Sequence, residues 1–259
     1  MKTFDYSYDD IVANLKNVGI KTGDKIFIHS NLGFFGTLKD TNDPIEICTL
    51  FKKAIFEVIG KEGTLIVPTF SYSFTKNEIF DQNFTPSVCG IFSEFIRKDL
   101  ESIRTPDPNF SIASIGPNTE FFTKNLSNHS FDENSFWQKF LRKNGKICNF
   151  NFDSGSTFIH YVEKLLNVVY RFDKGFNGTS ITNGKNEDKI FYHFVYDLEK
   201  STDIPDFTKF DKRAKELGLT KIKNLGKGQV LSISTRDTLE LIQNEIIKNP
   251  SFLIKGSND

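Results

Sequence analysis

The sequence predicts an α/β fold: a single three-layer domain in which a central mixed sheet is flanked by helices. Two apolar runs, Lys25–Ser30 and Gly63–Phe70, are typical of buried strands. Segments with apolar residues at helical spacing lie between such runs, and this alternation indicates a layered α/β domain. No repeat, low-complexity tract or linker interrupts the 259 residues, which suffice for one large core. We therefore expect one domain over residues 1–259.

The first part of the chain is expected to form two helix–strand pairs. Residues 7–18 place their apolar side chains on one helical face, and a glycine follows them. The buried strand at 25–30 comes next. A second helix is expected at 44–59, where proline occupies the first turn and glycine follows the end. In the strand at 63–70, the backbone hydrogen bonds to a neighbouring strand are expected to end at Pro68, because proline has no N–H to donate.

The middle of the chain continues the alternation. A helix is expected at about 88–100, and the two prolines within 104–108 require an extended, turn-rich loop. The pattern then predicts a strand at 110–115, a helix at 117–126 and a strand at 146–152.

The last part of the chain completes the sheet and closes on a helix. Residues 189–196 alternate like a strand, and a charged loop is expected at about 197–209. A helix at 208–217 ends at a glycine, and it is followed by a strand at 229–234 and a helix at 235–248.

Composition excludes several partners. Lys and Arg number 33, as do Asp and Glu, so the formal charge is zero and gives no electrostatic reason for nucleic-acid or anionic-membrane binding. The N-terminus has no apolar run, so neither a signal peptide nor a membrane span is expected. Cys48, Cys89 and Cys148 have no disulfide or zinc spacing and are typical of reduced thiols in a cytoplasmic protein.

One helix carries a pair of residues suited to proton transfer. Residues 156–166 have a single apolar stripe and begin with Ser156 or Thr157 as N-cap. His160 and Glu163 lie three residues apart and therefore share one helical face. A carboxylate beside an imidazole is a common way to fix the tautomer of a general base. An ordinary surface pair gives the same spacing, so this pair alone does not decide the function.

The loops after the predicted strands are the places where open α/β sheets bind ligands. Three stretches occupy such positions: His29 to Gly33, Pro68 to Ser71, and Asn151 to Thr157. Gly33 and Gly36 permit close approach of a ligand to the backbone, whose N–H groups could meet a phosphate or a carbonyl oxygen.

Several motifs occur in a specific order along nearly the whole chain. They are His29-Ser30-Asn31-Leu32-Gly33 with Gly36, Gly63 to Phe70, Pro86-x-x-x-Gly90-x-x-x-Glu94-x-x-Arg97, Arg104-Thr105-x-x-Pro108-x-x-Ser111-x-x-x-x-Gly116, His129, Gly145-Lys146, Thr157-x-x-His160-x-x-Glu163 and Asn249-Pro250. In this order and spacing the chain resembles the aminoglycoside 3-N-acetyltransferase family.

The resemblance implies transfer of an acyl group from acyl-CoA to an amine on a sugar-like ring, in a ternary complex without an acyl-enzyme and without a metal. His160 would be the general base and Glu163 its partner. The residues expected to line the path of the coenzyme are His29, Ser30, Asn31, Leu32, Gly33, Phe34, Gly36, Pro68, Thr69, Phe70 and Ser71. Those expected near the acceptor are Glu94, Arg104, His129 and Asn151. For Glu94, Arg104 and His129 a structural role is the alternative.

The chemistry of such a reaction sets two demands. A protonated amine is no nucleophile, so a base must remove its proton as the thioester is attacked. The developing oxyanion needs donors, for which the backbone N–H groups of residues 30–33 and the Thr69 hydroxyl are candidates.

Two departures from the family pattern concern the edges of the site. Asp107 stands where the family usually has histidine in an Arg-Ser-x-His-Pro loop, and Thr37-Leu38-Lys39 replace a second glycine pair after Gly36. The first change affects the acceptor side and the second affects the edge of the coenzyme site.

Charge in the expected acceptor-side insertion, residues 171–212, bears on the substrate. Its acidic residues are Asp173, Glu187, Asp188, Asp197, Glu199, Asp203, Asp206 and Asp211, and its basic residues are Arg171, Lys174, Lys185, Lys189, Lys200, Lys209 and Lys212. Since a polycation pocket should be rich in carboxylates, this near balance favours a neutral or anionic acceptor, such as a nucleotide-linked amino sugar for surface glycan synthesis. An aminoglycoside antibiotic is the alternative, and the acyl group could exceed acetyl.

Other function classes fit less well. The four histidines show no short metal spacing, and no Gly-x-Ser-x-Gly elbow is present, which argues against zinc and serine hydrolases. A non-catalytic protein that binds CoA or a sugar nucleotide remains the alternative outside enzymes. A homodimer is compatible with the sequence, which does not determine the oligomeric state.

Overall fold

The structure, a computed structural model, describes residues 4–196 and 204–256. Its main sheet has the strand order β4-β5-β2-β1-β6-β10-β9. These strands are β1 (Lys25–Ser30), β2 (Thr64–Pro68), β4 (Ile103–Arg104), β5 (Ile112–Ile115), β6 (Lys146–Phe150), β9 (Lys221–Leu225) and β10 (Gly228–Ser234). The central strands β2, β1 and β6 are parallel and the outer strands antiparallel, which confirms the predicted mixed sheet.

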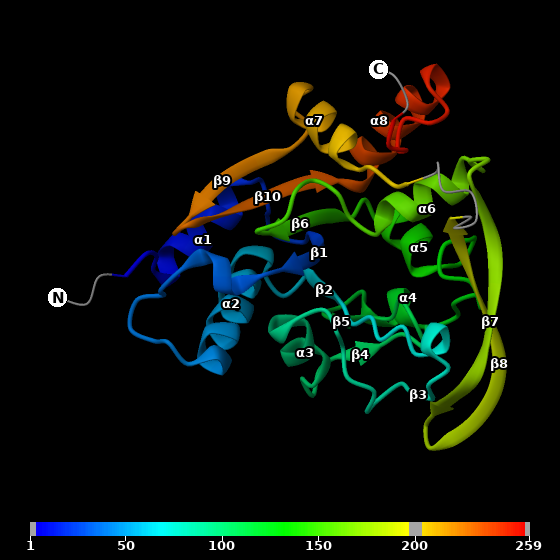
Figure 1. Ribbon diagram of the computed structural model, residues 1–259. Coiled ribbons are helices and arrows are strands. Elements are labelled where there is room, and N and C mark those ends of the chain that lie inside the picture. The colour runs from blue at the N-terminus through cyan, green and yellow to red at the C-terminus, as the bar shows by residue number, and fades with distance from the viewer. Residues whose placement is uncertain (1–3, 197–203, 257–259) are drawn as a thin grey trace.

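A second sheet stands beside the first. It has the order β3-β7-β8 and consists of β3 (Phe80–Asp81), β7 (Arg171–Thr182) and β8 (Lys185–Tyr196). β7 and β8 form one long hairpin, visible on the right of Figure 1, in which Arg171 pairs with Tyr196 at the open end. Phe74, Phe80 and Phe191 form the small core beneath it, together with the 3₁₀ turn η2 (Phe74–Lys76).

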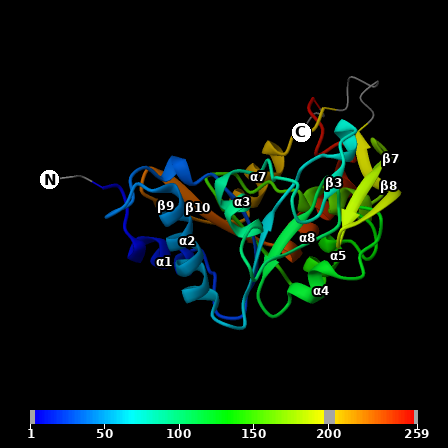
Figure 2. The ribbon, with the colours of Figure 1, turned by 90° about the horizontal axis from the view of Figure 1, so that it is seen from below.

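Helices cover both faces of the main sheet, as the sequence predicts (Figures 1 and 2). One face packs against α1 (Tyr8–Asn17), α2 (Pro44–Ile59) and α3 (Ile91–Arg97), and the other against α4 (Thr119–Thr123), α5 (Phe136–Arg142), α6 (Phe158–Leu165) and α8 (Thr235–Lys248), with α7 (Thr208–Glu216) packed on α8. Successive side chains of β1 point to opposite faces of the sheet. Ile26 and Ile28 pack in the core under α1, α2 and α3, and Phe27 packs in the core on the other face.

Local signals explain where several helices begin and end. Ser7 and Asp10 form a capping box at α1. At α2 the Asp43 carboxylate accepts two backbone N–H groups, proline opens the first turn, and Gly60 follows the end with φ of 65°. The predicted N-cap of α6 is found at Thr157, although its hydroxyl makes no capping hydrogen bond.

The predicted helices and strands are present; α3, α4, α6, β2, β5 and β6 are shorter than predicted, and β8 begins earlier, at Lys185. The sequence patterns missed α5, β7 and β9, and also β3 and β4, whose two residues each are too few to show a pattern. α5 is too short for helical periodicity to show, and β7 and β9 expose most of their side chains, so they lack an apolar pattern. Residues 197–203, the first part of the predicted charged loop at 197–209, lie outside the described residues. No helix within the described ranges is long and apolar enough to span a membrane.

Candidate active site

The predicted His160–Glu163 pair is formed on α6. The His160 Nδ1 atom lies 3.1 Å from Glu163 Oε2, and the Glu163 side chain is fully buried. The His160 side chain keeps 22% of its surface exposed and is flanked by the rings of Phe131 and Phe207, each 5.5 Å away. The carboxylate therefore lies behind the imidazole, which reaches solvent from an aromatic setting.

Two residues at the open end of the β7–β8 hairpin support the buried carboxylate. Arg171 Nη2 lies 2.9 Å from Glu163 Oε2, and the Tyr196 hydroxyl donates to Oε1 at 3.0 Å. Burial by itself would raise the pKa of Glu163, but the hydrogen bond from His160 and the Arg171 charge outweigh it and hold that pKa below its usual value. Glu163 is therefore ionised at neutral pH.

The surroundings of His160 keep its imidazole neutral. Burial and the Arg171 charge lower the pKa of His160, and the hydrogen bond and charge of Glu163 oppose them without prevailing. A neutral imidazole with a carboxylate on Nδ1 has its Nε2 lone pair available to accept a proton. This is the arrangement that a general base requires.

The carboxyl ends of β1 and β6 lie side by side, and the Asn149 amide on β6 donates to the carbonyl oxygens of Asp153 and Gly155 in the loop that leads to α6. The Asn31 N–H donates to Phe150 O at 3.0 Å, and Asn151 Nδ2 donates to Asn31 O at 2.8 Å. Asn151 Oδ1 accepts the N–H of Gln229 at 2.9 Å. Both ends of the Asn151 side-chain amide thus tie β1 to β10, which is a structural role, and the predicted acceptor contact of Asn151 remains a prediction.

The loop after β1 divides into an exposed and a buried part. It continues as the 3₁₀ turn η1 (Leu32–Phe35), in which Leu32 is buried and Phe34 is 66% exposed. Gly33 has no neighbouring atom closer than 3.9 Å to a Cβ placed there, so a ligand can approach it. At Gly36 the backbone has φ of 85° and the Asp5 carboxylate occupies the adjacent space. A side chain at position 36 would therefore meet Asp5, and the predicted ligand approach at Gly36 remains a prediction.

Buried polar atoms without hydrogen-bond partners lie at the end of β1. They include His29 Nε2 and Ser30 Oγ, and also Asn149 Oδ1 on β6, whose residue pairs with His29 in the sheet. Burial lowers the pKa of His29 to about 4, so this imidazole is neutral. Since such atoms are rare in folded proteins, they are available to a ligand that enters here.

The stretch from Pro68 to Ser71 lies behind the site rather than on its surface. All four residues are buried, the Thr69 hydroxyl donates to Ser111 Oγ at 3.2 Å, and the Ser71 hydroxyl donates to Pro108 O at 2.8 Å. Thr69 and Ser71 thus have structural contacts, and the predictions that this stretch lines the coenzyme path and that Thr69 donates to an oxyanion remain predictions. Phe70 still reaches the site through Phe110 and Phe131, at ring distances of 5.2 and 5.3 Å.

Glu94 and Arg104 hold loops together. Glu94 pairs with Arg97 at 2.7 Å and accepts the N–H of Ser87 at 3.0 Å. Arg104 is 6% exposed, and its guanidinium donates to the carbonyl oxygens of Thr69 and Thr85 at 2.6 and 2.5 Å. These contacts agree with the structural alternative, and the predicted substrate contacts of Glu94 and Arg104 have no support from their positions.

His129 lies beside the base of the hairpin. Its Nε2 atom is 2.9 Å from Asp173 Oδ1, and its Nδ1 atom accepts the N–H of Phe131. Lys164 holds the other oxygen of Asp173 at 2.5 Å. His129 therefore carries its proton on Nε2 and fixes the segment that places Phe131 against His160, while Asp173 keeps 44% of its side chain exposed.

Asp107, which departs from the family pattern, belongs to a second buried polar network. It accepts the N–H groups of Asn109 and Phe110, both at 2.8 Å, and the hydroxyl of Ser130. Ser130 Oγ lies 2.7 Å from Nδ1 of the buried His193, whose Nε2 faces the Asn109 amide. Asp107 thus connects the 105–111 loop to the hairpin.

Sequence reasoning missed Arg171 and Tyr196 as members of the site. Arg171 was counted only among the charges of 171–212, and no spacing relates either residue to α6. One signal was available: Glu163 lies four residues after Ile159 and three before Leu166, so apolar residues share its helical face, and a buried carboxylate with a buried cation could have been expected.

Two further observations concern ligands. Within residues 4–196 and 204–256, no group of three or more His, Cys, Asp or Glu side chains could hold a metal ion.

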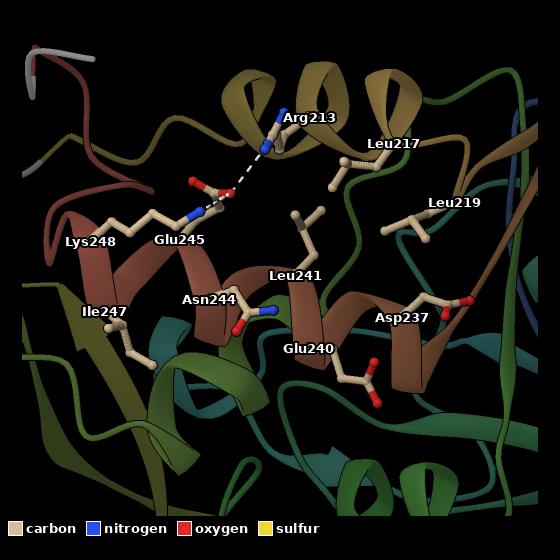
Figure 3. A pocket seen from close by; sticks show the side chains of 10 residues that line it. All are labelled: Arg213, Leu217, Leu219, Asp237, Glu240, Leu241, Asn244, Glu245, Ile247 and Lys248. Carbon is tan, nitrogen blue, oxygen red and sulfur yellow. Dashed lines mark hydrogen bonds and ion pairs between the residues drawn. The ribbon is translucent and has the colours of Figure 1, made fainter.

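A hollow of about 400 Å³ lies between α7 and α8 and is lined by residues such as Leu217, Leu241 and Ile247 (Figure 3), but by none of the predicted site residues. It is therefore not the candidate active site.

Known proteins match over most of the chain. The aminoglycoside 3-N-acetyltransferase family matches residues 27–246, whereas curated protein sequences give no match. The aminoglycoside acetyltransferase AAC(3)-IVa apoenzyme is 19% identical, with a TM-score of 0.78 over 97% of this chain and 92% of that one. AAC-IIIb in binary complex with CoASH is 17% identical, with a TM-score of 0.76 over 92% and 97%. AAC-VIa bound to sisomicin is 20% identical, with a TM-score of 0.77 over 93% and 98%.

At these identities the structural likeness establishes a shared mixed α/β fold, as predicted. The family match covers most of the sequence and includes the His160–Glu163 motif. It confirms the predicted resemblance and the predicted class of acyl-CoA-dependent N-acyltransferase. The chain belongs to the aminoglycoside 3-N-acetyltransferase family.

Proposed function

We propose that the protein transfers an acetyl group from acetyl-CoA to an amino group of an aminoglycoside, with His160 as general base and Glu163 as its partner. The observation that carries this proposal is the His160 imidazole, neutral and partly exposed, with Nδ1 on a buried carboxylate. The family match and the solved relatives that hold CoASH or sisomicin support the choice of substrates.

In the proposed reaction the acceptor amine attacks the thioester carbon directly. Nε2 of His160 takes the proton that the amine loses as the new C–N bond forms. The tetrahedral intermediate then collapses, the C–S bond breaks, and the CoA sulfur leaves and takes up the proton held by His160. The oxyanion of the tetrahedral intermediate requires hydrogen-bond donors. The backbone N–H groups of Leu32 and Gly33, on the turn after β1, are our candidates.

The coenzyme is expected to enter over the exposed part of that turn. Asn31, Gly33 and Phe34 are exposed there, and His29 and Ser30, which precede them at the end of β1, carry unpartnered polar atoms. The three free cysteines and the need for a CoA thioester support a cytoplasmic location.

The family and the relatives favour an aminoglycoside over the nucleotide-linked amino sugar that the charge balance of residues 171–212 suggested. The two acceptors are distinguished by release of free CoA thiol. Purified protein with acetyl-CoA is tested against gentamicin, sisomicin and a nucleotide-linked amino sugar. A higher kcat/KM for the aminoglycosides is expected, and a higher value for the nucleotide sugar would overturn the choice of acceptor.

Replacing the base tests the assignment of His160. Because acid–base assistance typically contributes roughly 10²–10⁴-fold in rate, the His160→Ala variant is expected to lose at least about 10²-fold in turnover. Calorimetric titration with CoA is the control, since the variant should bind CoA as the unaltered protein does. Normal turnover in a folded variant that binds CoA would eliminate His160 as the base.

A further inference from the structure

Three groups converge on one oxygen of Glu163. His160 Nδ1 lies 3.1 Å from Oε2, Arg171 Nη2 lies 2.9 Å from the same oxygen, and the two nitrogen atoms are 2.8 Å apart. The side chains of Glu163 and Arg171 are 0% and 4% exposed, so water does not screen this contact. The charges of this cluster are therefore strongly coupled.

A buried carboxylate needs a cation close to it, and two cations could serve here. One is the imidazolium form of His160, which would pair with Glu163 but could not accept a proton. The other is Arg171, since guanidinium groups are not deprotonated in proteins. With Arg171 as counter-ion the imidazole can be neutral, because a second positive charge beside the guanidinium is unfavourable.

Arg171 is fixed in place by contacts that do not involve the dyad. Its Nη1 donates to Phe194 O at 2.8 Å, and its guanidinium lies 3.6 Å above the Tyr196 ring. Since Arg171 begins β7 and Tyr196 ends β8, the hairpin itself holds the cation against α6. The position of the charge therefore does not depend on His160.

We propose that Arg171 is a positioning residue: it is the permanent counter-ion of Glu163 and thereby keeps the His160 imidazole neutral and able to accept the proton of the acceptor amine. This inference rests on the proposed function for its catalytic meaning. The role of Arg171 concerns the charge of the imidazole and not its tautomer: an Nδ1–H that donates to Glu163 leaves Nε2 basic, whereas a bare Nδ1 that accepts from Arg171 leaves Nε2 protonated.

The remaining ionisable neighbours leave this role to Arg171. Burial raises the pKa values of Tyr170 and Tyr196, so both phenols stay neutral. Lys164, the next residue after Glu163, pairs with Asp173 at 2.5 Å. From the loop before α5 and the start of α7, His160 is faced by the apolar rings of Phe131 and Phe207.

The test follows the protonation of His160 by ¹⁵N NMR in full-length protein and, in parallel, the pH dependence of kcat/KM. An adjacent charge typically moves a pKa by roughly 1–3 units. In Arg171→Met the pKa of His160, and with it the pH at which kcat/KM falls on the acidic side, are therefore expected to rise by about that much. Tyr196→Phe removes a neutral donor to the same carboxylate. It is expected to shift the pKa of His160 and the acidic limb of kcat/KM by less than about half of the shift in Arg171→Met.

A second variant separates charge from packing. Arg171→Lys keeps the positive charge, so its His160 titration is expected to stay nearer to that of the unaltered protein than to that of Arg171→Met. The proposal would be overturned if the pKa of His160 shifted equally in Arg171→Lys and Arg171→Met. It would also be overturned if that pKa were unchanged in Arg171→Met.

The unaltered protein gives a test that does not depend on the stability of any variant. Its His160 must be neutral at pH 7, and an imidazolium signal would overturn the proposal. Because the NMR titration needs no acceptor, this result is independent of whether the protein acetylates aminoglycosides.

Discussion

Glu163 keeps its charge in a position that excludes water, and its neighbours determine what that charge does. Hydrogen bonds from His160 and Tyr196 and the Arg171 guanidinium occupy both of its oxygens. Unpaired, such a group would become protonated or destabilise the fold by several kcal/mol. At the scale of the residue, the same Arg171 charge that stabilises the buried carboxylate also disfavours a positive charge on His160.

The second buried network makes a prediction about pH. Burial lowers the pKa of His193 to about 4, below the 6.5 expected in the unfolded chain. Between these values the unfolded state binds the proton first, so stability falls as pH decreases from about 6.5 to about 4, by up to about 1.4 kcal/mol per pH unit for this one group. Burial also lowers the pKa of His29 to about 4, so His29 likewise reduces stability as pH decreases over this range.

Urea unfolding of the unaltered protein and of His193→Asn, each at pH 7 and pH 5, measures this effect. The variant is expected to lose about 1–2 kcal/mol less between the two pH values, because it lacks one group that titrates in this interval. The comparison uses the difference between pH values, so a general loss of stability in the variant does not affect it. Equal losses in both proteins would show that His193 is not held neutral.

At the scale of the element, the β7–β8 hairpin is the part that the site depends on most. Its open end supplies Arg171 and Tyr196, His193 lies three residues further in on β8, and Gly178 lies so close to the Phe74 ring that a Cβ would overlap with it. Close packing at Gly178 thus fixes the hairpin on η2, and the open end is fixed by Arg171.

Gly178→Ala tests how firmly the hairpin is packed. Overpacking a filled contact typically costs about 1–3 kcal/mol, so the variant is expected to be less stable by about that amount. It is also expected to lose activity if the hairpin shifts Arg171. The exposed neighbour Asn177 provides the matched control, since Asn177→Ala should change the free energy of unfolding by less than about 0.5 kcal/mol. Equal stability of the two variants would contradict tight packing at Gly178.

At the scale of the whole molecule, sequence periodicity was sufficient for the layered fold. The buried strands β1 and β6 and the apolar faces of α2 and α8 show strong patterns, and these elements form the centre of the structure. β7 and β9 stayed hidden because exposed strands need no apolar alternation.

The candidate site was predictable where it is local in sequence. His160 and Glu163 are three residues apart, so helical geometry alone brings them together. Arg171 and Tyr196 reach Glu163 through the hairpin, and the burial of Thr69 depends on the 105–111 loop that covers it. Such contacts depend on how elements pack across the molecule, which no local pattern reveals.

The central claim is that His160 takes the proton of an acceptor amine bound between α6 and the turn after β1. A crystal structure of the protein with CoA and sisomicin tests it most directly. We expect one amine nitrogen of the drug within hydrogen-bond reach of Nε2, about 2.6–3.2 Å, and the CoA sulfur on the side of Asn31 and Gly33. A complex in which no amine approaches His160, or in which CoA lies away from that turn, would contradict the claim.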